Sequence, residues 1–260
     1  MLNFHLLKQY LIYTLKARYW RGHGAHSPFV YDFIRKTLIS RPKKYREIKR
    51  LVLSIKCNKQ LIEIKEVGAG SAAFKTTKRR VGDIARKAGI RNKYGKALHC
   101  LVKYVEAKNV LELGTSVGIS SVWMAYSNES TNVYTIEGNP EILNIAKNNF
   151  ENAELKNIYT QCANFDDVLH QKLTEMDFDI VFIDGNHTYE ATIKYFQILK
   201  HKLNNKCLVV FDDIYWSKGM TKAWKEIKKD KEVTISIDIF QLGIISFNTD
   251  LTRGDYIIRY

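Results

Sequence analysis

The chain is poor in the residues that mark several classes of protein. It has only 4 cysteines in 260 residues, and they form neither a CxxC pair nor a zinc-type spacing with histidine. We therefore expect no disulfide framework and no structural zinc site, and we expect reduced cysteines in a cytoplasmic protein. With only 3 prolines and 14 glycines, the sequence also argues against an all-β protein with many turns.

Long uncharged apolar runs are also missing from the sequence. No run reaches the roughly 18 residues that predict a transmembrane helix. The first 22 residues are apolar, but Lys8 and Lys16 interrupt them and no small-residue cleavage site follows, unlike in a signal peptide. We interpret this segment as a helix that packs on the rest of the protein rather than on a membrane. Its predicted apolar face includes Phe4, Leu7, Leu11 and Leu15.

Acidic residues are scarce in the first part of the chain. Residues 1–100 contain 24 Lys and Arg against 5 Asp and Glu, a balance of +19, whereas residues 101–260 carry 17 against 22, a balance of −5. A basic segment of this kind can face nucleic acid, an acidic membrane surface or an acidic substrate. A solvated basic surface that aids solubility is the alternative.

The pattern of apolar residues changes at Asn109. Before it, Ser27 followed by Pro28 predicts a helix start, and helical stretches at 28–39 and 42–55 predict a basic, mainly helical extension over residues 1–75. A further helix is expected at 94–105, leading into the first apolar run. After it, helical stretches alternate with seven apolar runs, at 109–114, 132–138, 157–162, 178–184, 207–213, 233–240 and 243–248, and a further candidate lies at 256–259. This alternation predicts an α/β domain over residues 76–260, with a doubly wound, Rossmann-like, seven-stranded, mostly parallel sheet and helices on both faces.

A glycine turn and an acidic residue follow the first two of these strands. Gly114 permits a tight turn, Gly118 allows the backbone to approach a ligand, and the next helix offers free N–H groups. Glu137 ends the second strand 23 residues after Gly114 and can accept both hydroxyl hydrogens of a ribose. The combination fits either a dinucleotide or S-adenosylmethionine. A second glycine loop, at 66–71, lacks a following apolar helix and a matching acid, so we interpret it as a flexible loop.

Three carboxylates end the fourth and fifth strands of this domain. Asp184 and the pair Asp212–Asp213 are expected to meet at one sheet edge, where their mutual repulsion favours a hard cation such as Mg²⁺. Alternatively, Asp184 positions the substrate directly and Asp212 caps a turn. His187 lies three residues after Asp184 and is either a general base or the cap of the helix that begins at Tyr189.

Four segments resemble the class I S-adenosylmethionine-dependent methyltransferases: VLELGTSVGISSVWMA, TIEGNP, FDIVFIDGNHTYE and VVFDDIYW. The resemblance covers about residues 80–248. It is closest to the metal-dependent O-methyltransferase branch, which includes catechol and caffeoyl-coenzyme A O-methyltransferases and has a Trp three residues after the second acid, as Trp216 follows Asp213 here.

The resemblance implies roles for individual residues. S-adenosylmethionine would contact a set of residues along the strand ends, comprising Glu112, Gly114, Thr115, Ser116, Gly118, Glu137, Ala163, Asn164 and Asp184. Within this set, Glu137 would hold the ribose, and Asn164 stands where the family often has an aspartate that contacts adenine; a helix cap is the alternative for Asn164. Asp184, Asp212 and Asp213 would hold Mg²⁺, and His187 with Asp184 would be catalytic.

These features lead to an expected activity and a set of expected partners. We expect a methyltransferase that moves a methyl group to a hydroxyl oxygen of a small or anionic substrate, assisted by a divalent metal. The alternative is an RNA methyltransferase recruited by residues 1–100. The expected partners are a small-molecule substrate, nucleic acid in the alternative, and a second copy of the chain in a homodimer.

Overall fold

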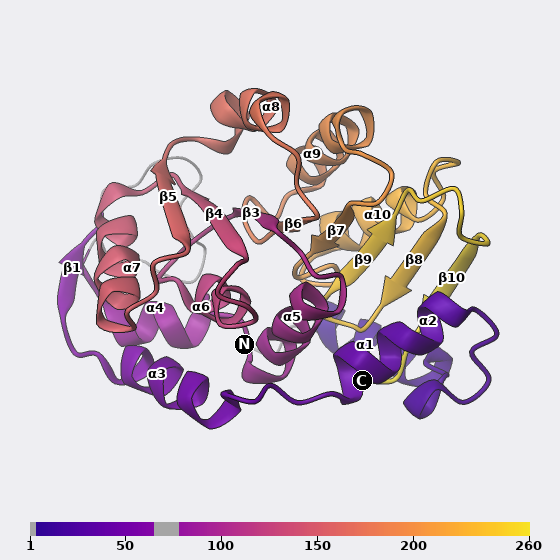
Figure 1. The fold of residues 1–260 in the computed structure, drawn as a ribbon, viewed down its shortest axis with the longest axis horizontal. Helices are drawn as coiled ribbons and strands as arrows, with labels where there is room; N and C mark the ends of the chain where they lie inside the picture. Colours follow the sequence, from indigo (N-terminus) through magenta and orange to yellow (C-terminus); the bar gives the residue numbers. More distant parts are fainter. Residues whose placement is uncertain (1–3, 65–77) are drawn as a thin grey trace. The chain divides into compact units, whose positions relative to one another are not determined.

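A computed structural model describes residues 4–64 and 78–260 (Figure 1). The chain divides into two compact units, one made of residues 1–39 and 170–260 and the other of residues 40–169, and each is described by itself. The glycine loop at 66–71 lies outside the described residues. The predicted boundary between residues 75 and 76 lies there too, so the division into an extension and a catalytic domain stays a prediction.

The unit of residues 40–169 is built around three parallel strands in the order β3-β4-β5. These strands are β3 (Asn109–Leu113), β4 (Asn132–Glu137) and β5 (Ile158–Cys162). The helices of the unit are α3 (Tyr45–Cys57), α4 (Val81–Lys87), α5 (Asn92–Tyr104), α6 (Ile119–Ala125) and α7 (Pro140–Asn152). A short antiparallel pair, β1 (Leu61–Glu63) and β2 (Lys78–Arg80), completes it.

The core of this unit forms where α5 packs on α6. Trp123 of α6 is fully buried, and a Cβ placed on Gly95 of α5 would lie 2.3 Å from its ring, so only glycine fits at that crossing. His99, also on α5, is buried, and its Nδ1 lies 3.0 Å from the carbonyl oxygen of Trp123. Because that carbonyl can only accept, the imidazole nitrogen donates. Burial lowers the pKa of His99 to about 4, so the ring is neutral near pH 7.

The unit of residues 1–39 and 170–260 contains five strands in the order β10-β8-β9-β7-β6. They are β6 (Ile180–Ile183), β7 (Leu208–Phe211), β8 (Ile235–Asp238), β9 (Gly243–Ser246) and β10 (Gly254–Ile257). β6 and β7 are parallel, as are β8 and β10, whereas β9 is antiparallel to both β7 and β8. The helical segments are α1 (Phe4–Lys16), η1 (Trp20–Gly22), α2 (Pro28–Phe33), η2 (Ile34–Ile39), α9 (Tyr189–Lys202) and α10 (Lys218–Ile227). α8 (Phe165–Glu175) runs from the other unit into this one.

In the described residues, eight strands belong to the main sheet, most of them parallel to a neighbour, and helices alternate with them along the chain, which confirms the predicted α/β class. The predicted number of seven strands is wrong by one. The additional strand is β10, which overlaps the further candidate at 256–259. In the described part of the chain β10 pairs with β8, and none of its four residues is buried, so its sequence lacks a clear apolar run. The serine cap predicted before Pro28 is confirmed, because Ser27 Oγ accepts from the N–H of Val30 at 3.4 Å.

The amino-terminal helix α1 lies against the carboxyl-terminal strands (Figure 1). The buried Tyr13 donates its hydroxyl to the carbonyl of Ile258 at 2.5 Å, and its ring contacts that of Phe240 after β8. The predicted apolar face of α1, however, does not pack on the protein, so that prediction is wrong. Its four members are solvent-exposed: Phe4 by 80%, Leu7 by 44%, Leu11 by 57% and Leu15 by 86%.

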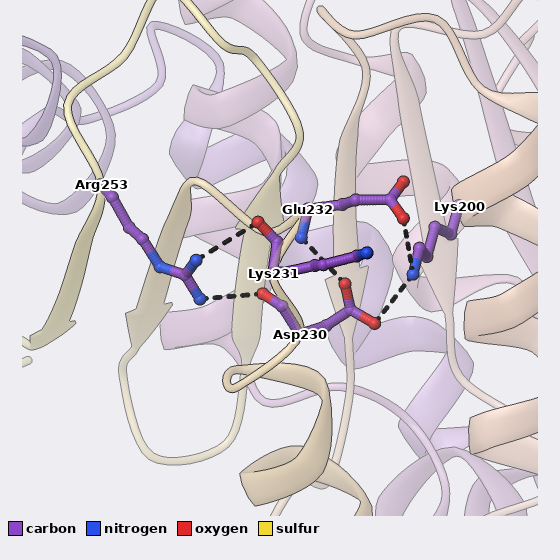
Figure 2. Close-up of polar contacts among 5 residues, drawn as sticks. All are labelled: Lys200, Asp230, Lys231, Glu232 and Arg253. Carbon is purple, nitrogen blue, oxygen red and sulfur yellow. Dashed lines mark hydrogen bonds and ion pairs between the residues drawn. The ribbon is translucent and has the colours of Figure 1, made fainter.

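An ion cluster fixes the turn between α10 and β8 (Figure 2). Lys200 at the end of α9 bonds Asp230 at 3.0 Å and Glu232 at 2.8 Å, and the side chain of Lys200 is only 10% exposed. From the other side, the Arg253 guanidinium donates to the carbonyls of Asp230 and Lys231. The two carboxylates raise the pKa of Lys200, so the lysine remains charged and the turn is held from both directions.

Within residues 4–64 and 78–260, no helix is both long and apolar enough to cross a membrane. The cysteines at 57, 100, 162 and 207 are all free thiols in this part of the chain.

Candidate functional site

The turn between β3 and α6 has the shape that its glycines predict. Gly114 and Gly118 have φ values of 106° and 86°, and Ser116 between them has 47°. The N–H of Gly114 donates to Ile136 at 2.9 Å, and the N–H of Gly118 donates to Thr115 at 2.8 Å. The turn is therefore hydrogen-bonded to the end of β4 and contains an internal hydrogen bond.

Glu137, at the end of β4, bonds directly to this turn. Its Oε2 accepts from the N–H of Ser116 at 2.9 Å, and its Oε1 accepts from the N–H of Asn139 at 3.0 Å. The side chain is only partly buried, so a ligand can reach the carboxylate. The structure thus brings together the two features that the sequence linked by spacing alone.

Gly118 has a structural requirement that the sequence did not reveal. A Cβ at this position would lie 2.4 Å from the Phe150 ring on α7. The absence of a side chain therefore allows α7 to pack against the turn, in addition to permitting the left-handed backbone.

A buried polar network lies beneath the turn. Glu112 is completely buried, and its Oε2 accepts from Ser121 and, at 2.6 Å, from Thr135. The hydroxyls of Thr135 and Thr115 are 2.5 Å apart. These bonds link β3, β4 and α6 beside the turn, so Glu112 and Thr115 fix the position of the turn.

Ala163 and Asn164 follow β5 at the same edge as Glu137. The N–H of Ala163 donates to the carbonyl of Glu137 at 3.1 Å. Asn164 is exposed, and its Oδ1 lies 3.4 Å from the N–H of Asp166 in the first turn of α8. This contact is the helix cap that the sequence left open as the alternative for Asn164.

The acidic residues after β6 and β7 belong to the other unit. Ile183 and Phe211 are paired at the ends of these parallel strands, and the N–H of Asp212 donates to Ile183 at 2.9 Å. Asp184 and Asp212 therefore start from adjacent strand ends, as predicted. Asp213 adopts a left-handed backbone with φ of 52°.

Asp212 is the most deeply buried of these acids, with 3% of its surface exposed. Its Oδ1 accepts from the N–H of Asp213 at 2.8 Å, and its Oδ2 lies 3.3 Å from Nε2 of Gln241. Burial, followed by the charges of Asp184 and Asp213, raises the pKa of Asp212 well above its usual range. The three carboxylates therefore share one electrostatic site.

His187 pairs with Asp184 within this site. Their Nε2 and Oδ1 atoms are 3.5 Å apart, and the side chains are 28% and 12% exposed. Burial lowers the pKa of His187, but the hydrogen bond to Asp184 and the charges of Asp184 and Asp213 outweigh it, so the pKa is raised overall. The helix cap at Tyr189 is supplied by Thr188, whose hydroxyl accepts from the N–H of Ala191 at 3.2 Å, so His187 is not needed for that role.

One contact of the carboxylate site was missed by sequence reasoning. Gln241 lies in the connection between β8 and β9 and reaches Asp212 because β9 is inserted between β7 and β8. No periodicity or motif marks Gln241. In the described part of the chain, no group of three or more His, Cys, Asp or Glu side chains is arranged to hold a metal ion.

The chain is similar to known methyltransferases. Residues 111–214 match the family described as a methyltransferase domain. A catechol O-methyltransferase of Niastella koreensis is 32% identical over 124 residues, which cover 46% of this chain and 55% of that protein. This chain thus spans only about half the length of that relative.

Two solved structures have a similar fold. An O-methyltransferase from Bacillus cereus in complex with SAH has a TM-score of 0.54 and 18% identity, covering 84% of this chain and 97% of its own. An SAH-bound methyltransferase of Podospora anserina has a TM-score of 0.56 and 14% identity, covering 79% and 97%. Residues 111–214 are therefore similar to a methyltransferase domain, and the sequence relative of this region is an O-methyltransferase.

Proposed function

We propose that the chain transfers a methyl group from S-adenosylmethionine to a hydroxyl oxygen of a small or anionic substrate. The observation that carries the proposal is the Glu137 carboxylate, held against the Gly114–Gly118 turn by two backbone N–H groups. An acid fixed in this way can accept from both hydroxyls of a ribose, as the matched family implies. The resemblance to a catechol O-methyltransferase supports oxygen as the acceptor and a hydroxylated small molecule as the substrate class.

The remaining cofactor contacts follow the same edge of the three-stranded unit. Gly114, Thr115, Ser116 and Gly118 would lie along the methionine part, with Glu112 supporting them from below. Ala163 and Asn164 would contact the adenine, and the exposed side chain of Asn164 is accessible for that role. Asp184 would complete the cofactor set from the end of β6.

The Asp184–His187 pair supplies the base in this proposal. The imidazole of His187 would accept the proton of the substrate hydroxyl. S-adenosylmethionine, when bound, would supply the electrophilic methyl group, and its sulfur would keep the electron pair of the broken sulfur–carbon bond. The Asp184 contact orients the ring and stabilises the imidazolium that forms.

We also propose that a divalent cation assists the reaction. Asp184, Asp212 and Asp213 would hold it after their side chains rearrange, since the described geometry does not arrange them around an ion. Their all-oxygen donor set suits Mg²⁺, and burial together with their neighbouring charges raises the pKa of Asp212. When bound, such a cation lowers the pKa of a coordinated hydroxyl. In the described geometry, the oxygens of Asp212 accept from the N–H of Asp213 and from Gln241.

The proposal is tested by methyl transfer from labelled S-adenosylmethionine to catechol and to cell extract. His187→Gln should lower kcat by about 10²–10⁴-fold, whereas exposed His170→Gln is the matched control and should retain activity. If the wild type does not bind S-adenosylmethionine in calorimetry, the proposed methyl transfer is wrong.

The metal is tested separately in the same assay. Excess chelator should abolish transfer and Mg²⁺ should restore it. Asp213→Asn should shift the Mg²⁺ requirement to higher concentration, and exposed Asp250→Asn should leave it unchanged. Transfer that survives chelation but is lost in His187→Gln would refute the metal and retain the base.

Nuclease treatment of the extract separates the two substrate classes. Labelling that survives nuclease supports a small molecule, and labelling that nuclease removes supports an RNA substrate recruited by residues 1–100. A native mass measurement tests the expected homodimer, and cell fractionation tests the expected cytoplasmic location.

A further inference from the structure

The solvent-facing side of α1 is apolar. The helix docks through its Tyr13 side, where the tyrosine is 5% exposed and its hydroxyl bonds Ile258. The opposite side carries the stripe of Phe4, Leu7, Leu11 and Leu15, which are exposed by 80%, 44%, 57% and 86%. At 3.6 residues per turn these four side chains project within about 80° of one another. Single exposed leucines are ordinary, but a continuous exposed stripe of this kind marks an interaction surface.

A row of lysines lies beside this apolar stripe. α10 exposes Lys218, Lys222, Lys225 and the following Lys229, whose spacing of four, three and four residues places them on one face. The two helices are linked by His5, whose Nε2 lies 2.9 Å from Thr221 Oγ1 on α10.

A groove of about 670 Å³ runs between α1 and α10 and joins the two features. Lys8 and Phe4 line it from α1, and the four lysines line it from α10. Among the described residues that line this groove, Glu226 is the one acid, and its Oε2 accepts from the hydroxyl of Tyr189 at 2.5 Å. The surface is therefore strongly cationic beside a strip of leucine and phenylalanine.

We propose that the α1 stripe and the α10 lysine row together bind the surface of an anionic lipid bilayer. The leucines and Phe4 would enter the boundary between headgroups and acyl chains, and the lysines would contact lipid phosphates. α1 has 13 residues, a length of about 20 Å, which is too short for the roughly 30 Å hydrocarbon core, so it would lie in the plane of the interface.

The combination of groups favours a bilayer over other occupants. A nucleic acid would engage the lysines but offers no apolar surface to cover three leucines. A second copy meeting the same patch across a two-fold axis would bring two lysine rows together, which is electrostatically unfavourable. An anionic bilayer satisfies both the charge and the apolar area, and this inference does not depend on the proposed methyl transfer.

Vesicle co-sedimentation of the full chain tests the proposal. The protein should sediment with vesicles of phosphatidylcholine mixed with phosphatidylglycerol, and much less with phosphatidylcholine alone, and added salt should release it. Leu7→Ser, Leu11→Ser and Leu15→Ser together should weaken partitioning at least about tenfold. The matched control is Leu53→Ser with Leu61→Ser, two leucines exposed by 61% and 63% elsewhere, which should leave partitioning unchanged.

Charge reversal tests the lysine row independently. Lys222→Glu, Lys225→Glu and Lys229→Glu together should remove the preference for anionic vesicles. Lys147→Glu, Lys202→Glu and Lys206→Glu change the net charge equally at other exposed positions and should retain it. Circular dichroism checks that each variant is folded.

Three results would overturn the inference. The first is the absence of wild-type binding to anionic vesicles at low salt. The second is an equal loss of vesicle binding in both charge-reversal variants, which would mean that net charge alone drives it. The third is vesicle binding that is unaffected by the serine substitutions in α1. Binding of an RNA probe, or a dimer in sedimentation, without vesicle binding would assign the surface to those partners instead.

Discussion

Replacing Glu137 with glutamine tests the cofactor site at its best-defined contact. The two carboxylate oxygens accept from different backbone N–H groups, those of Ser116 and Asn139. A glutamine has one acceptor oxygen, so its NH₂ group must face one of these N–H donors. The substitution therefore breaks one charge-assisted bond to the backbone and removes the negative charge that would hold the ribose.

The expected loss follows from these contacts. A hydrogen bond to a charged group contributes about 1.5–3 kcal/mol of free energy. The one acceptor oxygen of the glutamine can still accept a hydrogen bond, so the loss should be partial. We therefore expect Glu137→Gln to weaken S-adenosylmethionine binding by about 2 kcal/mol, or roughly 30-fold in Kd. Isothermal titration calorimetry measures this directly. Exposed Glu151→Gln on α7 is the matched control and should bind as the wild type does.

A second ligand separates a ribose contact from a general distortion of the turn. The 2′-deoxy analogue of S-adenosylhomocysteine lacks one of the proposed hydroxyl partners, so it should bind the wild type more weakly than the parent compound does. In Glu137→Gln this difference should largely disappear, because the partner of the hydroxyl is already weakened. An unchanged Kd in the variant, or a deoxy penalty equal in both proteins, would refute the ribose assignment. A thermal melt at each step confirms that the compared proteins are folded.

Two further substitutions test how the same unit is stabilised. Burial lowers the pKa of His99 to about 4, so the unfolded chain takes up a proton before the folded protein does as the pH falls, and up to about 3 kcal/mol of stability should be lost between pH 6.5 and 4. In urea titrations, His99→Asn should remove most of this loss, whereas exposed His201→Asn should not. A wild-type stability independent of pH over that window would contradict the reasoning. Gly118→Ala should lower the free energy of unfolding by about 2–4 kcal/mol, since it places a Cβ on a left-handed backbone and 2.4 Å from the Phe150 ring. Gly24 has a φ of 76° but no neighbour within 4 Å of its Cβ position, so Gly24→Ala should lower the free energy of unfolding by only about 1 kcal/mol. Equal losses in the two variants would show that the Phe150 contact is unimportant.

Strands β3 and β4 could be predicted because each is an apolar run bounded by polar residues. The run at 109–114 became Asn109–Leu113, and the run at 132–138 became Asn132–Glu137. Helix ends were less certain where the first turn is polar. α10 begins at Lys218, where Ser217 caps it by accepting from the N–H of Met220 at 3.1 Å.

The site residues at strand ends could be inferred from the chain because parallel strands bring their carboxyl ends to one edge. Asp184 and Asp212 were expected to be neighbours for that reason, and the pairing of β6 with β7 makes them so. Gln241 could not be inferred in the same way. Its contact with Asp212 depends on β9 entering the sheet antiparallel between β7 and β8, which local sequence does not specify.

The error at α1 has a different physical origin. Periodicity shows that a helix has an apolar stripe, but it does not show which surface the stripe meets, because a protein core and a bilayer interface favour the same side chains. The docked side of α1 is instead anchored by Tyr13 and His5, two amphipathic side chains whose polar atoms bond Ile258 and Thr221. These contacts attach α1 to the protein while burying few aliphatic side chains. The leucines therefore do not contribute to the docking of α1. Because they lie on its outer face beside the lysines of α10, we assign them to an external partner.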